Sequence, residues 1–290
     1  MQQTSDFFDF MKLKVIGFII SLVFIVFSFF GFFTKGLNFG IDFTGGLLFD
    51  ITADIDIGDL RQVLIDSKFD DFSVQSSGDS FIIRVSQDSK TDDDRKEGIE
   101  VIKTLLNEKI KDITYNKIDF VGPQVGEQLI KDGIYAFVLS ILVISIYIWF
   151  RFEWDFSIGV IITLIHDILI LFGIYSIFQI DFDLTSIAAI LTVMGYSMND
   201  TVVIYDRLRE FLPKYKDKSL LEIVNRSLTT TIRRTLLTSS TTLISLLILG
   251  FVGGDSIKNF SLIVFIGIII GTYSSFFVSA PAILYINKKK

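Results

Sequence analysis

Six apolar stretches constrain the fold of this chain more than any other feature of its sequence. Each approaches or exceeds the roughly 18 residues that are typical of a transmembrane helix. At about 1.5 Å per residue, each can cross a hydrocarbon core of about 30 Å, some of them only with help from flanking residues. The sequence therefore predicts an α-helical membrane protein with six transmembrane helices, at residues 15–33, 133–150, 156–178, 184–205, 235–252 and 260–286.

The first apolar stretch follows Lys12 and Lys14 and resembles the start of a signal peptide. It is longer than a typical signal-peptide core, and no cleavage site of small residues follows it. We therefore expect residues 1–33 to contain an N-terminus and a retained first transmembrane helix. Residues 34–132 then form an inserted domain, and residues 133–290 contain the other five helices.

Basic residues between the apolar stretches predict the orientation of the chain. Residues 207–234 carry eight Lys or Arg against three acidic side chains, and the chain ends in three lysines. Residues 179–183 contain no basic residue, and residues 253–259 contain only Lys258. Because basic residues concentrate in cytoplasmic loops, we expect both termini and a loop at 206–234 in the cytoplasm. The inserted domain is then extracytoplasmic.

Composition excludes several classes of site. The chain has no cysteine and a single histidine, which excludes a disulfide framework, a cysteine-based zinc site and a thiol nucleophile. It also lacks clustered histidine ligands and the GxxxxGK[ST] phosphate-binding loop. Residues 34–132 hold 20 acidic and 12 basic side chains, which is typical of a solvated domain and not of a nucleic-acid binder. We expect neither an enzyme nor a bound cofactor or metal.

The inserted domain shows a mixed pattern of strands and helices. Asp56 is a candidate N-cap of a first helix, and a second helix starts near Asp92. A turn is expected at 77–79. Alternating apolar residues predict strands at 47–53, from residue 74, at 81–85 and at 118–120. The order β-α-β-β-α-β predicts a ferredoxin-like α+β fold, which hosts many functions and does not by itself indicate one.

Two glycine-rich runs flank this domain, at residues 40–46 and 121–127. The simplest interpretation is that they form turns that join a rigid domain to two helices. The residues that we assign to these domain–helix junctions are Asp42, Gly45, Gly46, Gly122, Pro123 and Gly126.

The fourth apolar stretch contains an ionisable side chain. Asp200 lies well inside it, between Asn199 and Thr201. A carboxylate at the centre of a span costs about 3 kcal/mol on insertion scales, so it needs a partner, water or a proton. The fourth stretch is therefore a candidate functional region.

The fifth stretch supplies a candidate partner for Asp200. Positions 234, 238, 241 and 245 recur at helical spacing, which places Arg234 on one stripe with Thr238, Thr241 and Ser245. Hydroxyls on such a stripe could hold a water chain or simply tie helices together. An Asp200–Arg234 pair that fixes packing and one that has a functional role are both compatible with this pattern.

The third stretch carries the adjacent pair His166 and Asp167. A buried, hydrogen-bonded pair that orients helices is one interpretation. Two neighbouring ionisable groups deep in a membrane helix also form a functional hypothesis, since imidazole titrates near physiological pH. The last stretch contains Gly267 and Gly271 in a GxxxG pattern, which favours close helix packing.

Four runs occur in a fixed order along the chain. They are Gly-Ile-Asp-Phe-Thr-Gly-Gly at 40–46, Val-Gly-Pro-Gln-Val-Gly at 121–126, Gly-Tyr-Ser-Met-Asn-Asp-Thr-Val-Val at 195–203 and Arg-Thr-Leu-Leu-Thr-Ser at 234–239. Each run alone is modest, but the ordered set is highly specific and covers nearly the whole chain. Together they resemble the SecF branch of the SecD/SecF family of protein-export membrane proteins, which is RND-like.

The resemblance implies a function and a set of partners. A subunit of this kind lies in the bacterial cytoplasmic (inner) membrane and pairs with a separate SecD chain. The pair assists the Sec channel (SecY, SecE and SecG) and the SecA motor, and it uses the proton-motive force to help move the exported polypeptide. The family's coupling residues map to Asp200 and Arg234, and membrane lipid surrounds the helices.

The resemblance also gives the buried polar residues a joint hypothesis. Protonation of Asp200 would release Arg234 and let the fourth and fifth helices shift, with the motion reaching the inserted domain. Asn199, Thr201 and the hydroxyl stripe of the fifth helix would line a polar pathway. The pair His166 and Asp167 would extend that pathway or tune the Asp200–Arg234 pair. Both H⁺ and Na⁺ stay open as the coupling ion.

Two other functions are compatible with the sequence. One is an RND-type half-transporter for a small molecule, for which drug efflux would change when the chain is removed. The other is a structural subunit without ion coupling, for which Asp200 would not titrate under an imposed proton gradient. Copurification of a SecD-like partner favours the export function over the first.

Overall fold

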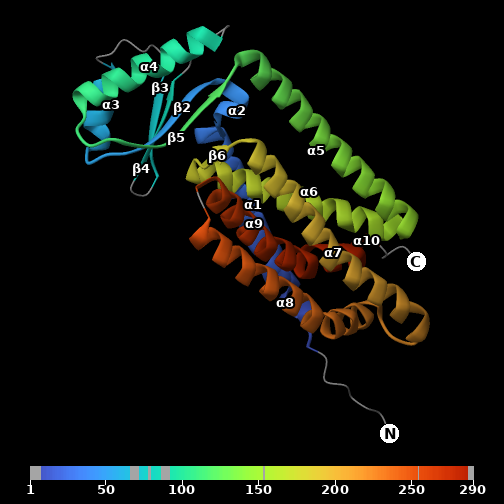
Figure 1. The fold of residues 1–290 in the computed structure, drawn as a ribbon. Helices are drawn as coiled ribbons and strands as arrows, with labels where there is room; N and C mark the ends of the chain where they lie inside the picture. Colours follow the sequence, from blue (N-terminus) through green and yellow to red (C-terminus); the bar gives the residue numbers. More distant parts are fainter. Residues whose placement is uncertain are drawn as a thin grey trace. The chain divides into compact units, whose positions relative to one another are not determined.

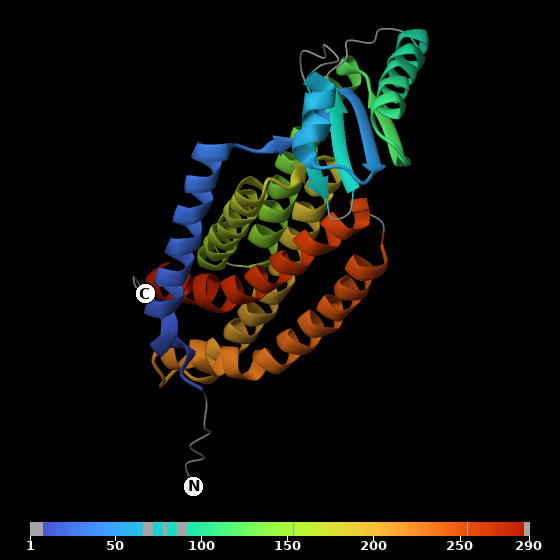
Figure 2. The same ribbon diagram turned by 90° about the vertical axis from the view of Figure 1, so that its left-hand side faces the viewer.

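The computed structural model describes residues 8–65, 72–77, 80–85, 92–152, 154–253 and 255–286. The chain forms two compact units. The first, which we call the membrane unit, comprises Met1–Asn38 and Ala136–Lys290. The second, which we call the inserted domain, comprises Phe39–Tyr135. Figures 1 and 2 show the helices of the first unit and the mixed fold of the second.

Long helices dominate the membrane unit. A short 3₁₀ turn, η1 (Phe10–Leu13), leads into α1 (Lys14–Lys35). Then follow α5, which begins in the inserted domain, and α6 to α10, with a π-helical turn, η2, between the last two. Their bounds are α5 Pro123–Arg151, α6 Trp154–Phe178, α7 Leu184–Lys214, α8 Leu220–Val252, α9 Asp255–Ser274, η2 Ser275–Ser279 and α10 Ala280–Ile286.

Six helical segments within the described residues are long and apolar enough to cross a membrane, as the sequence predicts. The spans of α6, α7 and α9 are the most buried, while those of α1, α5 and α8 are largely exposed. α9 packs against both α7 and α8, and α1 packs against α6. The centre of the bundle is therefore formed by α6, α7 and α9.

Close helix contacts in this centre depend on small residues, as the GxxxG pattern predicts. A Cβ atom added at Gly267 would lie 2.3 Å from Val193 Cγ2, and one at Gly271 would lie 2.8 Å from Ser197 Cβ. These distances leave no room for a side chain without a shift of α9 away from α7. The two glycines thus set the separation of these helices.

The segment 206–234 is largely helical and not the loop that we expected. α7 continues to Lys214 and α8 begins at Leu220, so only residues 215–219 lie between the two helices. Ser219 caps α8, because its side chain accepts a hydrogen bond of 3.2 Å from the Glu222 backbone NH. Charged residues mark where a helix leaves the apolar region, but they do not end the helix.

The last span departs from a regular α-helix. The π-helical turn η2 interrupts it between α9 and α10. Ser275 and Ser279 of this turn are buried, and Ser279 donates a hydrogen bond of 2.7 Å to the Tyr205 hydroxyl. Such π-bulges are common at functional sites.

Two short strands accompany the helices. β6 (Asp181–Phe182) lies between α6 and α7, and β1 (Asn38–Phe39) follows α1. Asn38 Nδ2 donates to Asp181 Oδ1 at 2.6 Å. Asp183 caps α7 by accepting a bond of 2.8 Å from the Ser186 backbone NH.

The inserted domain contains one four-stranded antiparallel sheet in the order β3-β4-β2-β5. Its elements are α2 (Ile41–Thr44), β2 (Gly46–Thr52), α3 (Ile57–Ile65), β3 (Phe72–Ser77), β4 (Ser80–Val85), α4 (Asp92–Lys109) and β5 (Thr114–Val121). From β2 onward this is the predicted order of elements. Leu47 lies opposite both Val85 and Phe120, which places β2 in the middle of the sheet.

The core of the inserted domain follows the predicted alternation. Its buried members are Leu47, Phe49, Ile51, Leu60, Leu64, Val74, Ile83, Val85, Ile102, Leu106 and Ile110. Asp56 accepts a hydrogen bond of 2.7 Å from the Gly58 backbone NH at the start of α3, as expected of an N-cap. The turn predicted at 77–79 falls partly outside the described residues, which omit Gly78 and Asp79.

Candidate functional site

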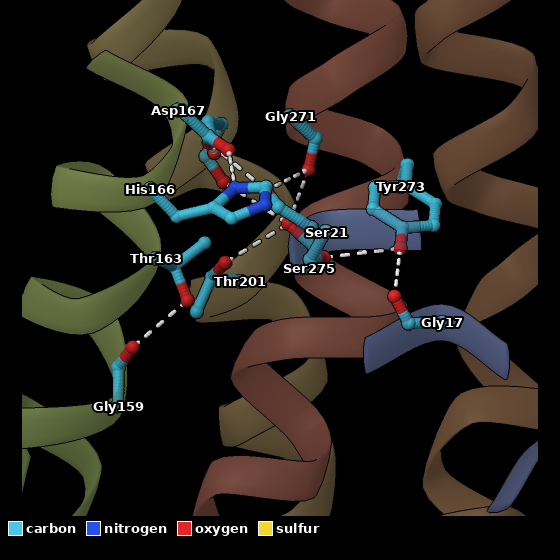
Figure 3. A network of polar contacts seen from close by, with 12 residues as sticks. Gly17, Ser21, Gly159, Thr163, His166, Asp167, Thr201, Gly271, Tyr273 and Ser275 are labelled. Atoms are coloured by element: carbon cyan, nitrogen blue, oxygen red, sulfur yellow. Dashed lines mark hydrogen bonds and ion pairs between the residues drawn. The ribbon is translucent and has the colours of Figure 1, made fainter. Parts of the chain in front are cut away.

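Three neighbouring helices place polar side chains inside the membrane unit. α6 contributes His166 and Asp167, α7 contributes Asp200, and the α9–η2 segment contributes hydroxyls. The buried polar residues of this region are Thr163, His166, Asp167, Ser197, Asp200, Thr201, Thr235, Ser239, Ser274, Ser275 and Ser279. Figure 3 shows part of this network between the helices. The sequence pattern singled out Thr201 among these hydroxyls, but it did not predict that Thr163, Ser274, Ser275 and Ser279 would be buried as well.

Asp167 is the most fully bonded carboxylate of the network. Its Oδ1 lies 2.9 Å from His166 Nδ1. Its Oδ2 accepts hydrogen bonds of 2.6 Å from Ser197 Oγ and of 2.9 Å from Ser274 Oγ. The side chain is 1% exposed, so three partners from three helices replace the water that a carboxylate requires.

His166 uses only one of its ring nitrogens within the described part of the chain. Nδ1 faces Asp167, while the buried Nε2 has no hydrogen-bond partner there. The ring lies 6.4 Å from that of Tyr273, centroid to centroid. The Tyr273 hydroxyl donates to the Gly17 carbonyl and lies 3.1 Å from Ser21 Oγ. Figure 3 shows that this contact brings α1 to the edge of the network.

Hydroxyls of η2 continue the network toward α7. Ser275 Oγ lies 2.9 Å from Thr201 Oγ1 and the same distance from the Gly271 carbonyl, to which it donates. Thr201 directly follows Asp200 in α7. The hydroxyl contacts near Asp167 therefore extend to the turn of α7 that carries Asp200. Of the two α7 residues that we predicted to line the polar pathway, Thr201 is buried at this contact and Asn199 is exposed.

Asp200 is as buried as Asp167 but far less bonded. It is 1% exposed. One hydrogen bond reaches it within the described residues, a bond of 3.3 Å from Thr272 Oγ1 to its Oδ2. Thr272 in turn lies 2.9 Å from Ser239 Oγ of α8. A buried carboxylate with a single long hydrogen bond is poorly satisfied.

Arg234 is placed near Asp200 but not against it. The side chain of Arg234 is exposed, and its charge acts on Asp200 through space. The described side chains include no ion pair between the two, although Asp206, six residues further along α7, forms one with Arg151 at 2.9 Å. In this structure Asp200 and Arg234 are therefore close enough to interact electrostatically, but their side chains are not in direct contact.

The predicted hydroxyl stripe of α8 lies on an exposed face. Thr238, Thr241 and Ser245 are exposed. Each donates to a carbonyl four residues earlier in its own helix, at 3.1 Å in all three cases. Ser239 and Thr235 are buried instead, one position along the helix from members of the stripe. Helical spacing alone identified a polar stripe but not which face of α8 turns toward α9.

The two glycine-rich junctions come together inside the inserted domain. Gly45 and Gly46 have φ angles of 71° and 106°, a region that favours glycine. Gly46 lies opposite Val121 in the sheet. A Cβ atom at Gly126 would lie 3.2 Å from the Phe43 carbonyl oxygen, so the first turn of α5 packs directly on α2. The two φ angles and this contact account for three of the predicted glycine positions, Gly45, Gly46 and Gly126.

The other junction residues have less specific surroundings. Asp42 is half-buried in α2. A Cβ atom at Gly122 would meet only Phe120, at 3.9 Å. Pro123 is the first residue of α5, and its side chain lies outside the described ones.

The buried ionisable side chains of the membrane unit lie in and near one hydrogen-bonded network. Among the described residues, no three His, Asp or Glu side chains are grouped so that they could bind a metal ion. Two carboxylates, one imidazole and several hydroxyls lie within the membrane unit instead. Such intramembrane ionisable groups are typical of proton relays.

Comparisons with known proteins identify relatives of this chain. The family described as "Protein export membrane protein SecD/SecF, C-terminal" matches residues 101–289, and the "SecD/SecF GG Motif" matches residues 30–54. The "Protein translocase subunit SecF" of Rickettsia bellii is 45% identical over 286 residues, which covers 97% of this chain and 94% of the relative. That of Rickettsia prowazekii is 42% identical over 97% of this chain and 92% of the relative.

Solved structures agree with these relatives. The crystal structure of SecDF from Thermus thermophilus, described as a translocon-associated membrane protein, has a TM-score of 0.88 and 32% identity over the whole of this chain. SecDF in a "Super-membrane-facing form" has a TM-score of 0.70 at the same identity. This chain spans 40% of the length of each SecDF chain.

Proposed function

This chain belongs to the SecD/SecF family of protein-export membrane proteins, and from this premise we propose that it couples proton flow to protein export through Asp200. It is a multi-pass membrane protein and an accessory subunit of the Sec protein translocase, in which it works with SecD. The relative named as a SecF subunit is matched over 94% of its length, and in the proposal SecD is a separate chain. Further partners in the proposal are SecY, SecE, SecG, SecA and the exported polypeptide.

The burial of Asp200 and its single hydrogen bond are the main support for this proposal. The carboxyl group is buried inside a membrane span and accepts one long hydrogen bond. An ionised carboxylate in such a place is costly, and adding a proton removes that cost. Since no other donor among the described residues holds the ionised form, Asp200 is the carboxyl that would exchange its proton most readily with the surroundings.

Arg234 and Thr272 would convert the proton on Asp200 into motion. Ionised Asp200 accepts from Thr272 and attracts the charge of Arg234, while protonated Asp200 attracts it much less. Thr272 also contacts Ser239 of α8. Gain and loss of the proton would thus change how α7, α8 and α9 hold together, a two-state element of the kind that drives helix shifts. His166 and Asp167 would hold the network in place and tune this pair.

The exposed face of α8 supports SecD as the neighbour of Arg234. Arg234, Thr238, Thr241 and Ser245 follow one line on a helix that crosses the apolar region. Charged and polar side chains within a span usually face protein or a water-filled cavity and not lipid. We therefore assign this face to contact with SecD and to the polar pathway, together with Asn199.

The orientation and the fold of the inserted domain complete the proposal. Both termini and the segment between α7 and α8 would face the cytoplasm, because residues 207–234, which include the adjoining ends of the two helices, carry eight Lys or Arg. The inserted domain would be extracytoplasmic. We infer a ferredoxin-like fold for it from its β-α-β-β-α-β order and the strand order β3-β4-β2-β5.

The junction glycines would pass motion to this domain. Because Gly126 packs against the backbone of α2, a shift of α5 would move α2 and the adjoining strand β2 with it. Gly45 and Gly46 would allow the sharp change of chain direction between α2 and β2. The junction thus links a membrane helix to the centre of the sheet.

A protein-export assay tests the coupling. Inverted membrane vesicles would carry this chain with its SecD partner, and export would be measured with and without an imposed proton gradient. We expect Asp200→Asn to remove the gradient-dependent part of export, and Arg234→Met to reduce it strongly. Asp206→Asn is the matched control, because Asp206 lies on the same helix but is partly exposed and pairs with Arg151. Full gradient-dependent export in both Asp200→Asn and Arg234→Met would contradict the proposal.

Cysteine labelling tests the orientation. The natural chain has no cysteine, so each introduced thiol is the sole target in it. Lys117→Cys lies in the inserted domain and Lys216→Cys in the segment between α7 and α8, and both positions are exposed. A membrane-impermeant maleimide added from outside should label the first and not the second. Labelling of the second alone would reverse the proposed orientation.

A further inference from the structure

A groove in the membrane unit runs between α1, α6 and the η2–α10 segment. Its volume is about 680 Å³, within the range of about 300–1,000 Å³ that is typical of ligand sites. Most of its lining is aliphatic or aromatic, with Phe18 from α1 and Phe277 from η2 among the larger side chains. An apolar cavity of this kind is a poor site for water.

Lys14 marks one end of the groove. It is the first residue of α1, and Tyr285, which also lines the groove, is the residue before the last of α10. Both positions lie at the ends of candidate membrane spans. The groove therefore starts at a membrane boundary, where lipid headgroups lie, and extends into the apolar region.

His166 marks the depth of the groove. Ser21 follows Lys14 by seven residues, or about 10 Å along the helix. Ser21 contacts Tyr273, whose ring lies beside that of His166 (Figure 3). His166 also lines the groove. An occupant that begins at Lys14 and follows α1 thus reaches the wall formed by the His166 ring, whose Nε2 has no partner among the described residues.

The positive charge of Lys14 indicates which kind of ligand the groove would bind. Within the described part of the chain Lys14 has no ion pair, whereas Lys12 lies 3.5 Å from Asp9. A basic side chain at the membrane surface attracts anionic headgroups, and the apolar lining behind it suits an acyl chain. A further transmembrane helix, about 10–12 Å wide, needs more room than this groove provides.

We propose that the groove binds one anionic glycerophospholipid, with its phosphate at Lys14 and one acyl chain along α1 as far as His166. The acyl chain covers the edge of the imidazole and keeps bulk water from the His166–Asp167 pair. This binding site is independent of the proposed coupling role of Asp200, and either can hold without the other.

Native mass spectrometry of the full chain with its SecD partner tests the headgroup contact. The complex is equilibrated in nanodiscs with equal amounts of phosphatidylglycerol and phosphatidylcholine, and the lipids that stay bound after release are counted. We expect the wild type to retain phosphatidylglycerol preferentially. Lys14→Gln should lower that preference about fivefold, the factor expected for one basic residue at an anionic surface. Lys12→Gln, the same change outside the groove, should leave it unaltered.

A second variant tests the groove itself. Ala282 lines it from α10, so Ala282→Trp should fill the space and reduce retention of both lipids, with circular dichroism to show that the helices persist. Equal retention of the two lipids by the wild type overturns the proposal. An unaltered preference in Lys14→Gln also overturns it, whether or not Ala282→Trp folds. Unchanged retention by a folded Ala282→Trp complex overturns the assignment of the chain to this groove.

Discussion

Asp167 and Asp200 are equally buried in neighbouring helices, yet their surroundings differ sharply. Asp167 has three partners at 2.6 to 2.9 Å, from α6, α7 and α9. Asp200 has one, at 3.3 Å. The same side chain at the same depth is thus fully satisfied in one place and almost unsatisfied in the other.

The different hydrogen bonding of the two carboxylates suits them to different roles. A carboxylate that joins three helices by short hydrogen bonds is costly to move, because each partner would lose its acceptor. A carboxylate with one long bond loses little when it gains a proton. The geometry therefore supports our proposal that Asp200 exchanges the proton and that Asp167 has a structural role.

Removing each carboxylate in turn gives the largest expected contrast. We expect Asp167→Ala to lower the free energy of unfolding by about 3–5 kcal/mol, as is typical when one member of a buried charged pair is removed. Asp200→Ala removes one long hydrogen bond and should cost about 1 kcal/mol or less. Unfolding in mixed micelles with increasing SDS measures both. Equal losses of unfolding free energy in the two variants would contradict the proposed difference between Asp167 and Asp200.

A glycine next to the Asp167 partners gives a smaller effect. Gly271→Ala places a Cβ atom 2.8 Å from Ser197 Cβ, which pushes away the residue that donates to Asp167. We expect a loss of about 1–3 kcal/mol from overpacking. Gly195→Ala is the matched control on α7, because nothing lies within 4 Å of its added Cβ. The same unfolding experiment should find the control neutral or slightly more stable, because Ala favours a helix more than Gly does. A loss of similar size in both variants would contradict overpacking against Ser197 as the cause.

The donors to the two carboxylates allow a finer test. Ser197→Ala removes a donor at 2.6 Å from Asp167 and should cost about 1–2 kcal/mol. Thr272→Val removes the donor to Asp200 and should cost about 0.6 kcal/mol or less. The effect on export should be reversed: Thr272→Val shifts its dependence on the proton gradient, and Ser197→Ala lowers yield without such a shift. If the dependence of export on the proton gradient changed only in Ser197→Ala, Asp167 and not Asp200 would be the carboxyl that exchanges the proton.

The exposed stripe of α8 gives the smallest change in stability. Among the described residues, Ser245 hydrogen-bonds only to its own helix, so Ser245→Ala should alter the free energy of unfolding by about 0.5 kcal/mol or less. Thr238→Leu combined with Thr241→Leu should also leave the isolated chain stable but weaken copurification with SecD. Undiminished copurification would remove this face from the proposed contact.

Hydropathy predicted the architecture well and the polar contacts poorly. The six spans, the inserted domain and the place of Asp200 and Asp167 inside helices all follow from local composition. The partners of Asp167 do not, because Ser197 and Ser274 come from other helices and reach it only through packing. A period of 3.6 residues finds stripes on α8, but it cannot select the one that faces α9.

The extent of the helices was also underestimated, for a physical reason. Charged residues after Tyr205 indicate where α7 leaves the apolar region, and we expected a loop there. Helix propensity does not require an apolar environment, and a run such as Arg207 to Lys214 is compatible with a helix in water. The exposed polar ends of α7 and α8 therefore continue as helix to residues 214 and 220.

Infrared difference spectroscopy of the complex with SecD tests the central claim most directly. With aspartate labelled by ¹³C in this chain alone, a step in pH across the membrane should produce the band of a protonated carboxylic acid. We predict that Asp200→Asn abolishes this band, while Ser197→Ala, which disturbs Asp167 and leaves Asp200 intact, retains it. A band that persists in Asp200→Asn would contradict the assignment of the exchanging proton to Asp200.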